Sequence, residues 1–202
     1  MFGGQHMLSL LFFILFGIVL IRWARGQSED LKVKVAHYFA WTIAATVVFW
    51  TVIKIYLRGF DIEEDLPLHL CNFMALLLPF FAAKRKYVYY EILLFWILAG
   101  TTHAVITPDL SQGFPNFVYI KYWYVHAGLI IFILYATLVL NFRPTLKSAF
   151  KSFVALQGYI VLMFILNAIF GANYFYTYGK PEVPSALDYL GEYPYYILTV
   201  EL

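Results

Sequence analysis

The chain has little charge and only one cysteine. Of its 202 residues, 13% are charged and 62% are hydrophobic, whereas soluble globular domains carry about 25% charged residues. The composition therefore excludes an ordinary soluble domain and predicts a protein of the lipid bilayer. A single cysteine, Cys71, allows no internal disulfide. The formal net charge of +2 is too small to indicate nucleic-acid binding, and no feature implies a soluble protein partner.

Basic residues are also missing from the first six positions. A cleavable signal peptide has Lys or Arg before its apolar run and a small-residue cleavage site after it. The first apolar run here lacks the preceding basic residues and ends in Arg22 and Arg25 without such a cleavage site. We expect this run to remain in the protein as a helix.

Apolar runs dominate the rest of the chain. A helix that rises about 1.5 Å per residue needs about 20 apolar residues to cross about 30 Å of hydrocarbon. Six runs approach this length: Met7–Trp23, Val35–Leu57, Leu66–Ala83, Tyr87–Ile106, Phe117–Leu140 and Phe153–Gly171. A seventh, Tyr195–Leu202, is too short to span as it stands. We predict an all-α, polytopic transmembrane helix bundle with six spans and the start of a seventh, forming one domain over residues 1–202.

The Lys and Arg residues are unevenly divided between the connections, and cytoplasmic loops carry the excess of these residues. Ten lie in the first, third and fifth connections: Arg22, Arg25, Lys32, Lys34, Lys84, Arg85, Lys86, Arg143, Lys147 and Lys151. Four lie in the others: Lys54, Arg58, Lys121 and Lys180. We therefore predict a multi-pass protein of the cytoplasmic membrane with its N-terminus outside.

The longer connections then face outward. One carries the acidic run within Arg58–Asp65, and another, Ala172–Pro194, is rich in tyrosine and proline. Loops longer than about 12 to 15 residues are usually functional or disordered. We expect the second loop to lie across the mouth of the bundle, either as an interfacial aromatic belt or as a lid over the site.

Polar side chains collect near the outer ends of four predicted helices. The stretch Leu66–Phe73, LPLHLCNF, begins the third helix, and we expect Cys71 and Asn72 roughly 6 to 8 Å below its outer end. Polar residues inside a membrane are costly and therefore suggest function. Other helices bring further polar residues to a similar depth: Thr101, Thr102, His103, His126 and Asn167.

These residues suit acyl transfer. A thiol in an apolar environment is inert, so a nucleophilic Cys71 needs a partner that favours the thiolate, and His126 is the candidate base. We expect His69, Asn72, His103 and Asp109 to stabilise the oxyanion or to orient the catalytic groups. Candidate substrate-cavity residues are Thr102, Lys121, Trp123 and Asn167.

Other interpretations stay open at this point. A lone buried cysteine is often a small apolar filler, and a lone intramembrane histidine often only bonds a neighbouring helix. Cysteine and histidine are also zinc ligands, but none of these residues has the i, i+4 spacing of ligands on one helical face, so we predict no metal and no other cofactor. A transporter or binding protein would use the same polar layer as its binding site.

Three short motifs give the chain a family resemblance. LPLHLC opens the third helix, ITPDLSQGFP follows the fourth, and YVHAG lies in the fifth. With these motifs in this order the chain resembles the YwaF family of bacterial integral membrane proteins over nearly its whole length. That family is similar to a eukaryotic transmembrane cysteine-dependent acyltransferase for polyunsaturated ether phospholipids. More remotely it resembles the androgen-induced membrane hydrolases of fatty acid esters of hydroxy fatty acids, which use a threonine and a histidine.

The resemblance implies that Cys71 is the nucleophile and His126 the base. Bacteria generally do not make the polyunsaturated substrates of the eukaryotic enzyme, so the substrate stays open. We therefore predict a membrane-embedded lipid acyltransferase or lipid ester hydrolase, with membrane lipids as substrate and solvent. The alternative is a transporter or binding protein for a lipid or small molecule.

Overall fold

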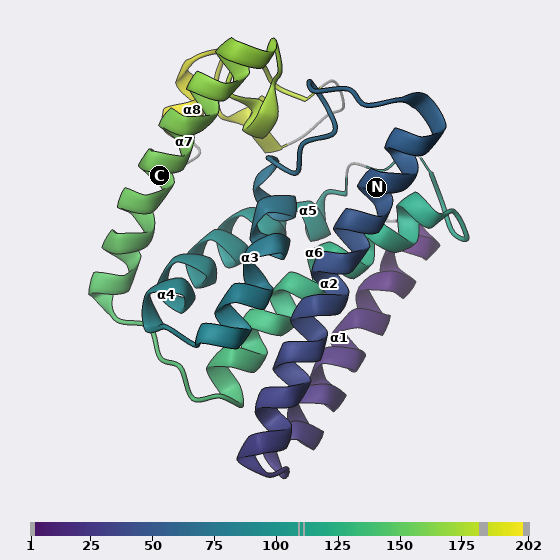
Figure 1. Cartoon of the computed structure of the whole chain (residues 1–202), viewed down its shortest axis with the longest axis vertical. Helices are drawn as coiled ribbons and strands as arrows, with labels where there is room; N and C mark the ends of the chain where they lie inside the picture. Colours follow the sequence, from purple (N-terminus) through teal and green to yellow (C-terminus); the bar gives the residue numbers. More distant parts are fainter. Residues whose placement is uncertain (1–2, 109, 111, 182–185, 200–202) are drawn as a thin grey trace.

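The computed structural model of the protein describes residues 3–108, 110, 112–181 and 186–199, and all regular structure in these residues is helical (Figure 1). In chain order the elements are α1 (Gly4–Arg25), α2 (Glu29–Arg58), α3 (Leu70–Lys84), α4 (Tyr87–Trp96), the π-helical segment η1 (Ile97–Thr101), α5 (Thr102–Ile106), α6 (Phe117–Leu138), α7 (Leu146–Phe170), the 3-10 turns η2 (Tyr174–Tyr176) and η3 (Ala186–Tyr189), and α8 (Tyr195–Thr199).

Five helical stretches in this part of the chain are long and apolar enough to cross a membrane. They are α1, α2, the continuous α4–η1–α5 rod from Tyr87 to Ile106, α6 and α7, and α3 is a shorter apolar helix of 15 residues. The prediction of a polytopic helical membrane protein is therefore confirmed. The third predicted span is shorter than expected, and the described part of the seventh run is the five-residue α8.

Helix α3 begins later than predicted. Its first residue is Leu70 rather than Leu66, and His69 before it has extended backbone angles. Pro67 has no N–H and disfavours a helical conformation in the residue before it, so the chain enters the bundle as a loop. Cys71 and Asn72 consequently lie in the first helical turn instead of one turn below it.

Two other helices extend beyond their apolar runs because capping residues set their ends. Helix α2 starts at Glu29, where the side chain of Ser28 accepts a hydrogen bond from the Leu31 N–H. Helix α7 starts at Leu146, after a capping box in which Thr145 and Ser148 each bond the other's backbone N–H. Such caps satisfy N–H groups that have no acceptor within the helix, so α2 and α7 include polar turns that hydropathy alone left out.

Helix α6 is the centre of the bundle. It contacts α1, α2, α3, α4, η1 and α5, whereas α7 packs mainly on α4 (Figure 1). A Cβ atom on Gly128 of α6 would lie 3.1 Å from Cδ1 of Ile43 in α2, so this glycine permits the close approach of the two helices. A Cβ atom on Gly17 of α1 would similarly lie 3.0 Å from Ile131 of α6.

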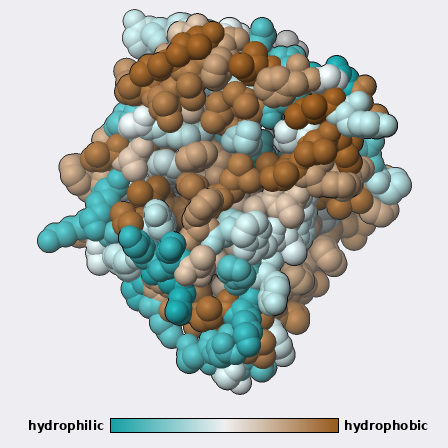
Figure 2. All heavy atoms as spheres, in the orientation of Figure 1, coloured by the Kyte–Doolittle hydropathy of each residue, from teal (hydrophilic) through white to brown (hydrophobic). Residues whose placement is uncertain are grey.

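The outer helices expose apolar side chains to the surroundings, and such side chains cover much of the face in Figure 2. Many large exposed hydrophobic residues belong to α1, α2 and α7, among them Leu8, Phe12, Val19, Val52, Val161 and Ile169. A soluble protein rarely exposes so continuous an apolar surface. These faces are therefore the ones that meet lipid.

An ion pair between the buried Glu91 and the exposed Lys151 fixes α7 against α4. Lys151 Nζ lies 2.7 Å from Oε2 of Glu91, and Ser148 Oγ donates to Oε1 of the same carboxylate at 2.8 Å. Trp96 Nε1 also donates to the Ser152 carbonyl oxygen at 3.1 Å. The residues that make these contacts are separated in sequence from the polar residues at the start of α3. The contacts hold α4 and α7 together.

Candidate functional site

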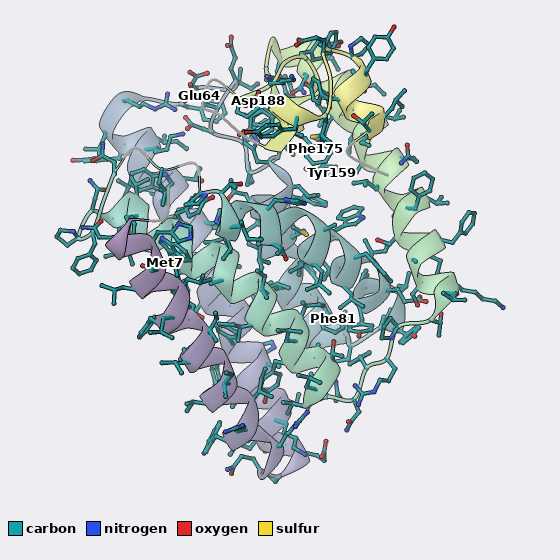
Figure 3. The ribbon with its side chains drawn as sticks, turned by 180° about the vertical axis from the view of Figure 1, so that it is seen from behind. Met7, Glu64, Phe81, Tyr159, Phe175 and Asp188 are labelled. Carbon is teal, nitrogen blue, oxygen red and sulfur yellow. The ribbon has the colours of Figure 1, made fainter. Side chains whose placement is uncertain are left out.

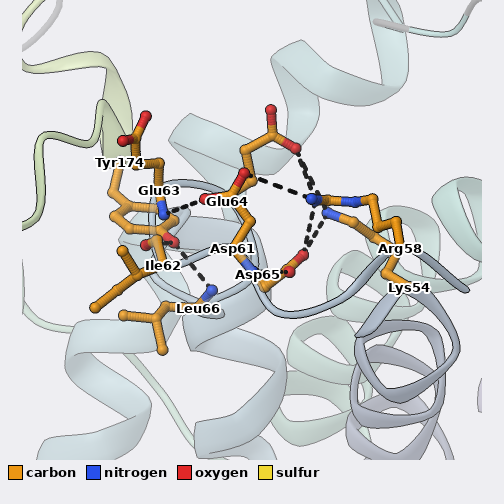
Figure 4. Close-up of polar contacts among 9 residues, drawn as sticks. All are labelled: Lys54, Arg58, Asp61, Ile62, Glu63, Glu64, Asp65, Leu66 and Tyr174. Carbon is orange, nitrogen blue, oxygen red and sulfur yellow. Dashed lines mark hydrogen bonds and ion pairs between the residues drawn. The ribbon is translucent and has the colours of Figure 1, made fainter. Parts of the chain in front are cut away.

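The acidic loop before α3 is held by two cations from the last turns of α2 (Figure 4). Oδ1 of the buried Asp65 lies 2.8 Å from Lys54 Nζ and 3.0 Å from Arg58 Nη2, and Oδ2 accepts from the Asp61 N–H at 2.8 Å. The hydrogen bond from Lys54 lowers the pKa of the Asp65 carboxyl, against the opposing effect of burial. The network fixes the path of the chain from α2 toward Leu66.

The segment after α7 closes over this loop. The hydroxyl of the buried Tyr174 donates to the Ile62 carbonyl oxygen at 2.7 Å and accepts from the Leu66 N–H at 3.0 Å (Figure 4). Burial raises the pKa of Tyr174. The ring of His69 lies 5.4 Å from that of Tyr174 and 5.3 Å from that of Tyr176. The described part of the predicted lid loop therefore lies across the start of α3.

Asn167 organises that segment from within α7. Its Nδ2 donates to the Tyr174 carbonyl oxygen and to Thr177 Oγ1, both at 2.8 Å, and its Oδ1 accepts from the Tyr174 N–H at 2.9 Å. Asn167 is 2% exposed, and its amide is occupied by these bonds. It therefore holds the loop, and it does not line the cavity as predicted.

Between these segments lies a polar cavity of about 430 Å³, within the range of about 300 to 1,000 Å³ typical of ligand sites. Its walls come from α2, the acidic loop, the start of α3, α6 and the segment after α7. They are Val47, Trp50, Thr51, Lys54, Glu63, Glu64, Asp65, Leu66, Pro67, His69, Asn72, Lys121, Asn173, Tyr176, Lys180 and Pro181. Three of the residues that the sequence suggested, His69, Asn72 and Lys121, therefore share one cavity.

Cys71 lies beside this cavity in the first turn of α3. It is a free, half-buried thiol whose Sγ lies 3.8 Å from Oγ1 of Thr101, close enough for a hydrogen bond in which either group can donate. Thr101 is the fully buried last residue of the π-helical segment η1. The first-turn N–H groups of a helix lack intrahelical acceptors and stabilise negative charge. These N–H groups can therefore donate hydrogen bonds to an oxyanion at the start of α3.

His126 is held in a defined orientation on α6. Its Nδ1 lies 2.7 Å from the Tyr122 carbonyl oxygen, and its ring lies 4.1 Å from the Tyr122 ring. With the proton on Nδ1 donated to that carbonyl, Nε2 is the unprotonated nitrogen that can accept a proton. The hydroxyl of Tyr122 donates to the Ala104 carbonyl oxygen at 2.8 Å, so this face of α6 is directed toward α5.

The π-helical segment η1 lies between the surroundings of Cys71 and those of His126. Segment η1 contacts both α3 and α6, and α3 also contacts α6 directly. Thr101 of η1 contacts Cys71. In the following turn the Ala104 carbonyl oxygen accepts a hydrogen bond from Tyr122, whose ring packs against that of His126. Segments of π-helix are rare and frequent at functional sites.

Tyr159 of α7 is a site neighbour that the sequence reasoning missed. Its hydroxyl donates to the Leu68 carbonyl oxygen, and its ring lies 5.1 Å from that of Phe73 and 5.4 Å from that of Phe175 (Figure 3). It thus supports the loop on one side of Cys71 and the first turns of α3 on the other. Nothing in the sequence distinguishes it from the other 16 of the 17 tyrosines.

The remaining predicted residues lie elsewhere. His103 is exposed on α5, so it is not a donor in the cavity, and Thr102 is half-buried but does not line the cavity. Trp123 is 2% exposed and packs against His6 and Phe13 of α1, and it does not line the cavity. Asp109 lies outside the described residues. Within the residues described, no three His, Cys, Asp or Glu side chains gather as metal ligands would.

The sequence model of the TMEM164 family matches residues 1–202, the whole chain. No curated protein and no solved structure matches it.

Proposed function

This chain belongs to the TMEM164 family, and from that premise we propose that it is a membrane-embedded lipid acyltransferase or lipid ester hydrolase of the cytoplasmic membrane. Cys71 is the nucleophile and His126 the general base. The observation that carries the proposal is the contact of the free Cys71 thiol with Thr101, on a segment that also packs against the helix bearing His126. The resemblance of LPLHLC and YVHAG to the YwaF family supports the same two residues.

In the first step His126 accepts the thiol proton, and Cys71 Sγ attacks the carbonyl carbon of a lipid ester. A C–S bond forms, the C–O bond of the ester breaks, and His126 returns the proton to the leaving lysolipid oxygen. In the second step the oxygen of an acceptor hydroxyl or of water attacks the thioester carbonyl carbon, so that a C–O bond forms and the C–S bond breaks. The proton of the attacking group passes to His126 and then to the departing thiolate. The Cys71 thiol is thereby restored.

The oxyanion of each tetrahedral intermediate needs hydrogen-bond donors. The backbone N–H groups of the first turn of α3 lack helical acceptors, and the side chains of Asn72 and His69 line the adjoining cavity. Losing one such donor typically lowers the rate about 10²- to 10³-fold. We expect Asn72→Ala to lower the rate by this order and to leave labelling of Cys71 by a small thiol reagent unchanged.

The decisive experiment compares Cys71→Ala, His126→Ala and the double variant, each purified as the full chain, for acyl transfer or ester hydrolysis with membrane phospholipids. Residues that act as one unit show strongly non-additive losses. All three variants should therefore lose a comparable share of activity, and intact mass should show an acyl adduct on Cys71 of the unmodified chain. Full activity in Cys71→Ala, or loss of activity on chelation of metals, would refute the assignment.

The polar cavity also favours a second candidate, a lipid or small-molecule transporter that binds its cargo there. Cys71→Ser separates the two. A transporter keeps transport with serine in this position, whereas the enzyme loses most of its turnover because a hydroxyl is a far weaker nucleophile than a thiolate.

A further inference from the structure

The polar cavity contains a lysine that forms no ion pair with a described residue. Three lysines line it: Lys54 pairs with Asp65 at 2.8 Å, and Lys180 lies over the Tyr196 ring, 5.7 Å from its centroid. Lys121, on α6, forms no ion pair or hydrogen bond with any residue that the structure describes. It is half-buried. A partly buried ammonium without a partner is costly, so an anion that enters the cavity will be bound there.

Lys121 also connects the cavity to the proposed catalytic residues. Lys121 shares the cavity with His69 and Asn72, which lie two residues before and one residue after Cys71. An anion bound by Lys121 therefore lies near the thiol. The simplest candidate is an anionic group of the same molecule whose ester the thiol attacks.

The order of residues along α6 matches the order of groups in a phospholipid. Helix α6 begins at Phe117 on the side of the bundle that holds the cavity, and Lys121 precedes His126 by five residues. At about 1.5 Å per residue, Lys121 lies about 7 Å closer to the outer end of the helix. In a glycerophospholipid the phosphate likewise lies nearer the water than the acyl ester, a few bonds away.

We propose that Lys121 binds the phosphate group of a glycerophospholipid and thereby positions its acyl ester beside Cys71. Lysine binds phosphate as a compact point charge with three donors. The inference rests on the proposed acyl-transfer function and adds the residue that selects a phosphate-bearing lipid over a neutral one. Lys121 is thus a specificity-determining residue.

The first test compares two substrates that differ in the phosphate-containing headgroup, dioctanoylphosphatidylcholine and dioctanoylglycerol. Because the lysine donates charged hydrogen bonds to the phosphate, Lys121→Met should lower kcat/KM for the phospholipid about 10- to 100-fold, mainly through KM. Turnover of dioctanoylglycerol should stay the same. Lys121→Arg should retain most activity on both, and Lys147→Met, a change at an exposed lysine at the start of α7, should alter neither. An equal loss on both substrates, or no loss, would overturn the proposal.

The second test needs no turnover and so separates this inference from the catalytic one. The full chain with Cys71→Ala is unfolded thermally in detergent with dihexanoylphosphatidylcholine, dihexanoylglycerol or inorganic phosphate. The phospholipid alone should raise the unfolding temperature, and Lys121→Met should abolish that shift. Equal stabilisation by inorganic phosphate at the same concentration would overturn the assignment to a lipid headgroup. Equal stabilisation by dihexanoylglycerol would overturn the role of Lys121.

Discussion

Replacing Asp65 with asparagine should destabilise the end of the bundle that holds the cavity. The Asp65 side chain is 0% exposed and contacts Lys54 and Arg58, whose side chains are 24% and 38% exposed. Removing one partner of a buried ion pair costs about 3 to 5 kcal/mol. Because both cations reach solvent here and asparagine can still accept from the Asp61 N–H, we expect a smaller loss, about 1 to 3 kcal/mol.

The stability that this network contributes should also depend on pH. The pKa of Asp65 lies below its ordinary value of 3.8, with the hydrogen bond from Lys54 as the main cause. The carboxylate therefore contributes its full stabilisation above the unfolded pKa, and the contribution disappears as the pH falls through the lower native pKa. In Asp65→Asn this part of the acid sensitivity should be absent.

The assay is thermal and denaturant unfolding of the full chain in a mild detergent, followed by intrinsic fluorescence between pH 3 and 7. Glu64→Gln is the matched control, because Glu64 pairs with Arg58 at 2.9 Å but its side chain is 67% exposed, and exposed pairs contribute about 0 to 1 kcal/mol. If Asp65→Asn destabilised the protein no more than Glu64→Gln does, the network would not hold the loop, and the reasoning would be refuted.

Three further predictions concern topology, the loop and the support of the thiol. In a Cys71→Ala background, a cysteine in place of Tyr189, which is 91% exposed, should react with an impermeant maleimide added to intact cells. A cysteine in place of Lys147 should not react. The reverse pattern would show that the predicted orientation in the membrane is wrong. Asn167→Leu leaves the Tyr174 N–H and carbonyl unbonded, so hydrogen exchange should increase in residues 172–178, and unchanged exchange would contradict the role of Asn167. Tyr159→Phe removes the hydrogen bond to the Leu68 carbonyl oxygen and keeps the ring, so it should lower the free energy of unfolding by about 0.5 to 1.5 kcal/mol. It should also change the rate at which a thiol reagent labels Cys71. An unchanged rate would show that Tyr159 does not position the thiol.

The sequence predicted the fold class well because apolar runs of spanning length follow directly from the thickness of the bilayer. It predicted the start of α3 poorly. Leu66 to His69 are apolar enough to extend the run, but hydropathy does not register that Pro67 breaks the helix. The depth assigned to Cys71 and Asn72 was wrong for that reason. The catalytic roles of Cys71 and His126 stay predictions.

Residues within helices were harder to place because depth does not give rotation about the helix axis. Trp123 and Lys121 are two residues apart on α6, and two residues turn a helix by about 200°. Lys121 consequently lines the cavity while Trp123 packs on α1. The position of Asn167 along its predicted helix suggested a cavity residue. Its hydrogen bonds to Tyr174 and Thr177 show instead that it holds the segment after α7.

The π-helical segment determines which side chain faces the thiol. Such a segment accommodates one residue more than the α-helix it interrupts, so everything after it is rotated by about 100° relative to an unbroken helix. Here the segment ends at Thr101, the residue that meets Cys71. If the same residues formed an unbroken α-helix, Thr101 would turn to a different face, away from Cys71. The partner of the thiol therefore depends on the backbone geometry of η1 as well as on the residues at positions 71 and 101, and a change in that geometry would separate Cys71 from Thr101 without any substitution at either.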